Sequence, residues 1–244
     1  RYHYDDALAT GTVAAGGSLG ILIPPSVIFI VYGILTEQSI GKLFAAGILP
    51  GILLASLFML TIYLVVRRNP ALAPKSSRVP FLDRAKSFGG VIEAFLIFAM
   101  VMGGLFFGMF TPTEAAGVGA FLTLLISIAR RQLTWPRFLQ SLMDTTKISC
   151  MVMTIVAGAV VFGHFMAITR IPFELANWVS TLQLPAHAVM AVIILMYVVG
   201  GCFMDSLAMI MLTIPIFFPV VKDLGFDPIW FGVIIVLVTE MGVV

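Results

Sequence analysis

The sequence predicts an all-α integral membrane protein with multiple transmembrane helices. Sixty per cent of the 244 residues are hydrophobic and only 11% are charged, and the mean hydropathy is +1.09. Soluble domains carry charge at about a quarter of their positions. Apolar runs of about 20 residues recur along the chain, and each can cross the roughly 30 Å hydrocarbon core of a bilayer. We therefore expect a lipid bilayer to surround most of the fold.

The composition also excludes several classes of protein. The net charge is only +2, so nucleic acid is not indicated as a partner. Cys150 and Cys202 lie in apolar runs without metal-ligand spacing and are expected to be small buried side chains. The sequence contains no GxxxxGK[ST] loop and no evident nucleophile-base-acid arrangement. We expect no enzyme, no cofactor and no transition-metal site.

The first apolar segment, residues 7–33, is expected to be a broken helix. Glycines at positions 16, 17 and 20 interrupt it, followed by residues 23–26 with two prolines. Glycine lowers helix propensity and proline removes a backbone donor, so we predict two half-helices with an unwound joint. The polar residues before it show no cap or signal peptide, and the sequence stops in an apolar stretch. Both ends are expected to be cuts through a longer protein.

The middle of the chain alternates apolar spans with basic stretches. Spans are predicted at 42–66, where Pro50 and Gly51 allow a kink, and at 88–110, 115–129 and 148–169. The basic stretches are 67–86 and 130–147. If both are cytoplasmic, that side holds every cation except Lys42, Arg170 and Lys222. The positive-inside rule therefore predicts this topology, with the turn at 111–114 toward the other side.

Two further segments are expected to lie at the membrane interface. In 130–147, apolar residues recur at roughly helical spacing among the cations, which is typical of an amphipathic surface helix: Leu133, Trp135, Phe138 and Leu142. Residues 170–185 contain a similar set, and tryptophan is enriched at interfaces: Phe173, Leu175, Trp178 and Leu182.

The turn before residue 115 is expected to cap a helix. It consists of Thr111, Pro112, Thr113 and Glu114. A threonine followed three positions later by an acid favours a helix N-terminus. We prefer this role to contact with a ligand.

The last part of the chain resembles a re-entrant hairpin. Apolar arms at 187–204 and 207–221 are short for full crossings, and Asp205 and Ser206 separate them. A final helix is predicted to start at Pro228. An offset of 222 residues aligns Tyr4 and Asp5 with Phe226 and Asp227. Because the two copies enter from opposite sides, we predict inverted repeats, which are typical of secondary transporters with midplane binding sites.

The breaks supply candidate ligands for sodium. At the first break these are backbone carbonyls near Gly17, Leu19, Gly20, Ile23 and Pro24 and the hydroxyls of Ser18 and Ser26. At the second they are Asp205 and Ser206, with Glu240 and Gly242 beside a further predicted break. The alternative at the first break is a proline kink that only packs. His164 is expected to be a packed histidine, with a proton relay as the alternative.

Several separated motifs resemble one family, the large membrane (DctM-like) subunit of tripartite ATP-independent periplasmic (TRAP) transporters. In order they are GSLGILIPPS at 17–26, Tyr32-Gly33, LFAAGILPG at 43–51, GMFTPTEAA at 108–116, FMD at 203–205, Pro215 and Pro219. The resemblance implies a sodium-coupled importer of organic acids in the bacterial inner membrane, working by an elevator-type movement. It also implies a periplasmic substrate-binding protein and a small (Q-type) membrane subunit as partners.

The resemblance also implies a division of the chain. Residues 1–33 would end a first transport-domain repeat, 34–185 would form scaffold-like spans, and 186–244 would belong to a second repeat. The family pattern includes a Ser-Gly-Ser-rich hairpin before the region that matches Arg1 and a Thr-Pro-Pro after the region that matches Val244. Their absence would leave each ion site short of ligands. A channel-like or scaffolding membrane subunit, or less plausibly an intramembrane enzyme, is the alternative function.

Overall fold

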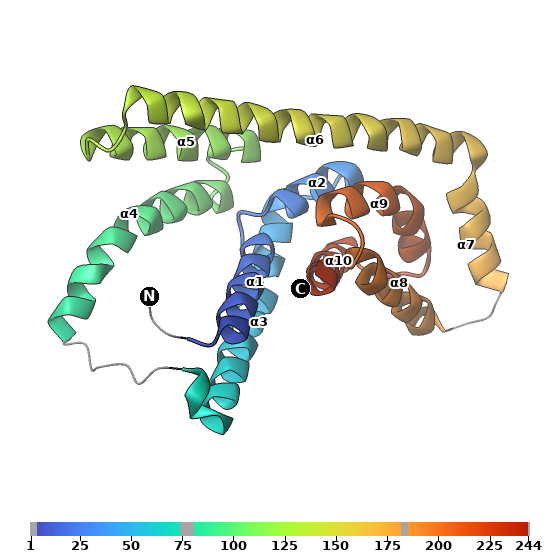
Figure 1. The fold of residues 1–244 in the computed structure, drawn as a ribbon. Helices are drawn as coiled ribbons and strands as arrows, with labels where there is room; N and C mark the ends of the chain where they lie inside the picture. The colour runs from blue at the N-terminus through green and yellow to red at the C-terminus, as the bar shows by residue number, and fades with distance from the viewer. Residues whose placement is uncertain (1–3, 74–80, 182–184, 244) are drawn as a thin grey trace. The chain divides into compact units, whose positions relative to one another are not determined.

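A computed structural model describes residues 4–73, 81–181 and 185–243, and this part of the chain is helical without strands (Figure 1). The helices are α1 (Asp6–Leu22), α2 (Val27–Thr36), α3 (Ile40–Arg68), the 3-10 turn η1 (Pro70–Leu72), α4 (Phe81–Phe106), α5 (Pro112–Ala129), α6 (Trp135–Thr169), α7 (Ile171–Thr181), α8 (Ala186–Gly201), α9 (Ser206–Asp223) and α10 (Pro228–Val243).

The helices confirm the predicted fold class. Among the described residues, five segments are long and apolar enough to cross a membrane: Asp6–Thr36, Ile40–Arg68, Pro112–Ala129, Trp135–Thr169 and Ser206–Asp223. Shorter apolar helices cover Val91–Phe106, Ala186–Gly201 and Pro228–Gly242. The chain is therefore a multi-pass, all-α membrane protein.

The chain divides into two compact units. The first comprises Arg1–Pro74 with Met153–Val244, and the second is Lys75–Val152. The first unit contains both broken segments, although they lie at opposite ends of the sequence. The predicted division at residues 33 and 185 remains a proposal, because compactness alone does not assign a segment to a moving or a fixed part.

In the first unit, the two broken segments pack against each other. Helix α10 contacts α8, α9, α1, α2 and α3, while α2 lies along α9 (Figure 1). The side chains of Phe29, Tyr32, Phe231 and Val236 are fully buried between these helices. Because lipid tails are as apolar as these side chains, their packing stabilises the helices mainly through van der Waals contacts. This core positions the helix breaks described below.

In the second unit, α4 and α5 form a hairpin. Gly108 takes a positive φ of 71° in the connecting turn, which favours glycine. The ring of Phe110 folds back onto Gly104, where a side chain would collide with it. At the other end, Nε of Arg130 donates a 2.7 Å hydrogen bond to Glu93.

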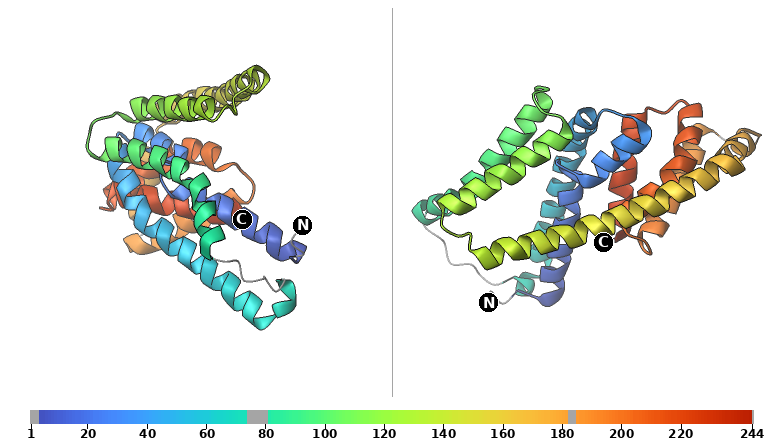
Figure 2. Two further views of the ribbon diagram at one scale, coloured as in Figure 1. Left: turned by 90° about the vertical axis from the view of Figure 1, so that its left-hand side faces the viewer. Right: turned by 90° about the horizontal axis from the view of Figure 1, so that it is seen from above.

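Helix α6 corrects one prediction. It runs unbroken from Trp135 to Thr169 (Figure 2), so 130–147 does not contain a separate interfacial helix. The physical reason is that positions 137–157 contain neither glycine nor proline, and the change from polar to apolar residues does not by itself end a helix. Its 35 residues extend about 52 Å at 1.5 Å per residue, longer than the roughly 30 Å of hydrocarbon.

Other boundaries shift by smaller amounts. Helix α3 continues through Pro50, and α4 begins at Phe81, within the predicted 67–86 loop. Phe173 and Trp178 are exposed on α7, while Leu182 lies outside the described residues. Both cysteine side chains are exposed instead of buried, because an apolar run does not by itself determine which of its side chains pack inside the protein. The sidedness of the basic stretches stays a prediction.

Candidate functional site

The first helix break is narrower than predicted. Helix α1 continues through Leu22, so Gly16, Gly17 and Gly20 are helical. Glycine costs only about 1 kcal/mol in a helix, whereas Pro24 and Pro25 end it outright. None of these glycines has a positive φ, and no described atom lies within 4 Å of a Cβ at Gly20. The prediction that these glycines belong to an unwound joint is therefore wrong.

The hydrogen bonds at the break separate the predicted oxygens into paired and unpaired ones. The amide of Ile23 donates to Leu19 O at 2.9 Å, and the Ser18 hydroxyl donates to Ala15 O at 2.9 Å. In a continuing helix, the carbonyls of Gly20 and Ile21 would accept hydrogen bonds from the amides four residues later, at positions 24 and 25. Both positions are prolines, which have no N–H group. The prolines therefore remove the helical hydrogen bonds of the Gly20 and Ile21 carbonyls. Ile21 was missed, although counting four residues back from each proline would have found it.

The joint is buried against two glycines of α3. A Cβ at Gly47 would lie 2.6 Å from the Phe29 ring and 3.1 Å from Leu22 O, and one at Gly51 would lie 2.7 Å from Ile23 Cγ1. The Ser26 side chain is 1% exposed and accepts a 3.3 Å hydrogen bond from Phe29 N, which caps α2. The glycines explain how α3 can approach the joint closely.

The second break lies where predicted, between α8 and α9. Asp205 caps α9, because its Oδ2 accepts hydrogen bonds from Leu207 N at 3.0 Å and Ala208 N at 3.4 Å. Asp205 is exposed, whereas the neighbouring Ser206 is buried. This capping role was not among the predicted roles of Asp205. The prediction that this tip lies within the membrane is not tested by the helix boundaries.

Glu240 joins this second break from α10. Its side chain is only 3% exposed and lies beside Ser206, and Asp205 is near enough to interact electrostatically. Its Oε1 has no hydrogen-bond partner among the described residues. An unpaired buried carboxylate oxygen is costly unless a proton or cation accompanies it.

Helix α10 does not break at 240–242, which corrects a further prediction. It remains helical through Val243, because positions 229–243 contain no proline. Gly242 instead lies in a close crossing with α8. A Cβ at Gly242 would be 2.6 Å from Val198 O, and one at Gly201 would be 2.8 Å from Thr239 O. This crossing holds α10 against the hairpin tip.

The predicted cap at 111–114 is confirmed. Thr111 N donates to Glu114 Oε2 at 2.8 Å, and Glu114 N donates to Thr111 Oγ1 at 3.3 Å. Pro112 occupies the first turn of α5, followed by Thr113. This reciprocal capping box satisfies backbone donors at the helix start. These residues are structural.

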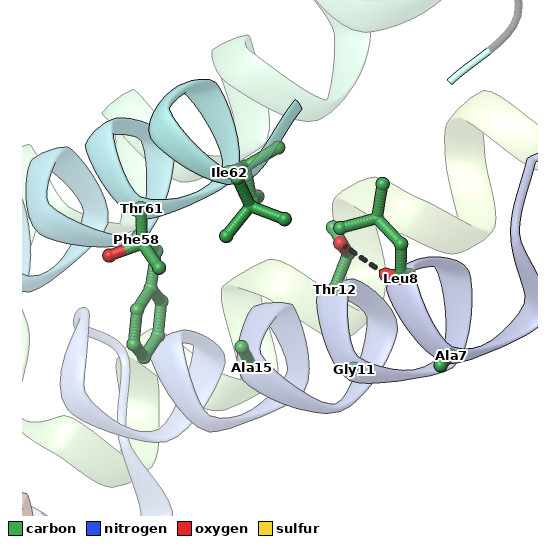
Figure 3. Close-up of a pocket in the computed structure, with 9 residues that line it drawn as sticks. Ala7, Leu8, Gly11, Thr12, Ala15, Phe58, Thr61 and Ile62 are labelled. Carbon is green, nitrogen blue, oxygen red and sulfur yellow. Dashed lines mark hydrogen bonds between the residues drawn. The ribbon is translucent and has the colours of Figure 1, made fainter. Parts of the chain in front are cut away.

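Two cavities of the first unit lie away from the breaks. One of about 260 Å³ lies between α1 and α3 (Figure 3), and its hydroxyls are engaged, since Thr12 donates to Leu8 O and Thr61 to Leu57 O. The other, about 420 Å³, is lined by apolar residues and His164. Neither contains a predicted sodium ligand.

The helix starts support the internal repeat. Helix α1 begins at Asp6 and α10 at Pro228, which is the same offset of 222 residues. Asp5 Oδ1 accepts from Ala7 N at 3.1 Å, and Asp227 Oδ1 accepts from Trp230 N at 2.8 Å. Asp5 thus caps α1, so the expectation that no cap precedes this helix is wrong. Inversion of the two copies across a membrane remains a prediction.

Comparison with known proteins assigns a family. The model described as "Tripartite ATP-independent periplasmic transporter, DctM component" matches residues 1–244. The chain is 37% identical to the C4-dicarboxylate TRAP transporter large permease protein of Pseudomonas aeruginosa, over 100% of the chain and 57% of that protein. It is 34% identical to the sialic acid TRAP transporter large permease protein of Vibrio cholerae, over 98% and 56%.

A third relative is the 2,3-diketo-L-gulonate TRAP transporter large permease protein of Escherichia coli, which is 31% identical over 97% of the chain and 55% of that protein. The chain therefore spans a little more than half the length of these relatives. Their names describe transporter permeases, which confirms the expectation of a non-enzymatic family. The chain belongs to the DctM component family of the tripartite ATP-independent periplasmic transporters.

Proposed function

We propose that the chain is part of the permease subunit of a sodium-coupled secondary transporter that imports a small organic acid across a bacterial inner membrane. Family membership supports the permease role. The substrate class is supported by relatives named for C4-dicarboxylate, sialic acid and 2,3-diketo-L-gulonate. These three compounds share a carboxylate, so the proposed substrate is an anionic organic acid.

The proposed partners follow from the tripartite organisation in the family description. A periplasmic binding protein would capture the acid and deliver it, and a small membrane subunit would complete the scaffold. Residues 1–33 and 186–244 would then belong to the transport domain and 34–185 to scaffold-like spans. Packing of α2 on α9 and of α1 on α10 supports common movement of the two broken segments.

The observation that best supports sodium coupling is the buried Glu240 carboxylate. Ser206 lies beside this carboxylate, and the carboxylate Oε1 has no hydrogen-bond partner in the described chain. With Asp205 nearby, the local charge is negative and the ligands are oxygens, which suits a dehydrated hard cation. At the other break, Gly20 and Ile21 supply neutral carbonyls. Cation binding at both helix breaks would favour the conformation of the permease that binds the substrate.

Uptake by the complete permease, reconstituted with its binding protein and small subunit, tests the proposal. We expect an inward sodium gradient to drive accumulation of substrate above the external concentration, with no accumulation when choline replaces sodium. A channel would equilibrate substrate without accumulating it. Equal uptake with sodium and choline would contradict sodium coupling.

A further inference from the structure

Tyr32 lies where α2 meets α10. It is in the second turn of α2 and its side chain is fully buried. Its hydroxyl donates a 2.5 Å hydrogen bond to the carbonyl oxygen of Pro228, the first residue of α10. The contact joins residues 196 positions apart in sequence, one in α2 and the other at the start of α10.

The Tyr32 ring fits against α10 because position 232 is glycine. A Cβ at Gly232 would lie 2.5 Å from Cε1 of the ring. The ring also meets Phe231 and Phe218 edge to face, at centroid distances of 6.5 and 6.4 Å. The hydrogen bond limits sliding of α2 along α10, and the ring contacts limit rotation.

Each helix joined by Tyr32 leads to one of the candidate cation sites. Helix α2 begins directly after the joint at 23–26. Helix α10 continues without a break from Pro228 to Glu240, a length of about 18 Å at 1.5 Å per residue. Since an unbroken helix moves largely as a unit, a shift of α10 at Tyr32 would displace Glu240 from Ser206.

We propose that Tyr32 is a positioning residue that fixes α2 against α10 and thereby links the two candidate cation sites. The inference rests on the proposed function, because it requires cation binding at both breaks. The inference states that sodium binding at one site affects binding at the other, whereas the proposed function states only that sodium binds. Two sites held in one arrangement affect each other's occupancy, and this coupling is lost when the connection loosens.

Sodium titrations of uptake by the complete reconstituted transporter test the linkage. Tyr32→Phe keeps the ring and removes the hydrogen bond. We expect the sodium concentration for half-maximal uptake to rise about twofold to tenfold, the range for loss of one hydrogen bond. The Hill coefficient for sodium should also fall. Substrate capture by the binding protein should be unchanged.

Tyr197→Phe is the matched control. Tyr197 is also fully buried and its hydroxyl is bonded to Thr213, but this bond connects α8 with α9 inside one segment. The variant loses a comparable hydrogen bond and should keep the wild-type Hill coefficient. A general effect of losing a buried phenol hydroxyl would instead change both variants equally.

Gly232→Ala provides a second, independent variant, because its methyl group would press on the Tyr32 ring. It should change the sodium titration in the same direction as Tyr32→Phe. Gly200→Ala is its control, since the added Cβ would meet only the flexible end of Met209. The inference would be overturned if the titrations of Tyr32→Phe and Gly232→Ala superimposed on that of the wild type. It would also be overturned if both controls changed as much as these variants. In either case the proposed function would stand. Wild-type uptake without sodium dependence would overturn the proposed function and the inference with it.

Discussion

The two helix breaks of the first unit arise from different chemistry. Helix α1 stops because Pro24 and Pro25 cannot donate hydrogen bonds to the carbonyls before them. The turn between α8 and α9 contains no proline, and α9 begins where the Asp205 side chain caps it. The first break therefore exposes neutral backbone oxygens. The second brings carboxylates together.

The breaks also differ in their surroundings. The joint at 23–26 is packed against Gly47 and Gly51 of α3. At the second break Asp205 is exposed, while Glu240 is buried with an unpartnered oxygen. A full negative charge attracts a cation more strongly than a carbonyl dipole does, especially away from water. We infer that the second break contributes more to cation affinity and the first more to geometry.

The largest effect is expected from Glu240→Gln, which removes the charge at nearly constant size. The sodium concentration for half-maximal uptake should rise about tenfold or more. The reason is that the variant loses the attraction between the carboxylate charge and sodium, which is strong in surroundings of low polarity. Glu114→Gln is the control, since that acid only caps α5. Equal sodium dependence of the two variants would mean that Glu240 has a purely structural role.

A smaller effect is expected from replacing Pro24 and Pro25 together by alanine. The restored amides can pair with the carbonyls of Gly20 and Ile21, which removes them as ligands. We expect the apparent sodium affinity to be about threefold to tenfold weaker, because the lost contacts to neutral carbonyls are comparable in strength to neutral hydrogen bonds. The same titration of Pro219→Ala, a proline within α9, is the control. If the double variant matched it, the prolines would serve packing only.

Gly47→Ala tests the packing of the joint. The added methyl would collide with Phe29 and approach Leu22 O, so we expect overpacking to cost about 1 to 3 kcal/mol. Thermal unfolding of the purified protein in detergent measures this. Gly41→Ala in the same helix is the control, because its nearest neighbour would be 3.9 Å away. Equal stability of both variants would contradict the close approach of α3.

The smallest effect is expected from Thr111→Ala in the second unit. Loss of the capping hydroxyl should cost about 1 kcal/mol of stability and leave sodium dependence unchanged, because the residue lies in neither break. Thr113→Ala, in the same turn without the capping role, should be nearly neutral in the same unfolding measurement. A changed sodium titration in Thr111→Ala would show that the sites are not confined to the first unit.

The sequence predicted the features that depend on local chemistry. The apolar runs identified the class of fold, Pro24 and Pro25 located the joint, and Thr111 with Glu114 identified the capping box. These signals act within a few residues, so no tertiary information was needed. The family was also recognisable from separated motifs.

The sequence did not predict features that depend on pairing or packing. The glycines in α1 predict a break, but the helix continues through them to Leu22. The continuity of α10 through Glu240 and the capping role of Asp205 were missed. The contact of Tyr32 with Pro228 joins distant positions, so no local pattern could indicate it. Burial of Glu240 likewise depends on where α10 meets α9.

The ratio of sodium ions to substrate tests most directly the claim that the second break is a charged cation site. Reversal potentials of the complete reconstituted transporter give this ratio. We predict that Glu240→Gln lowers the ratio relative to the wild type, because the charged site no longer holds its ion during transport, and that Thr111→Ala keeps it. An unchanged ratio in Glu240→Gln would contradict the account.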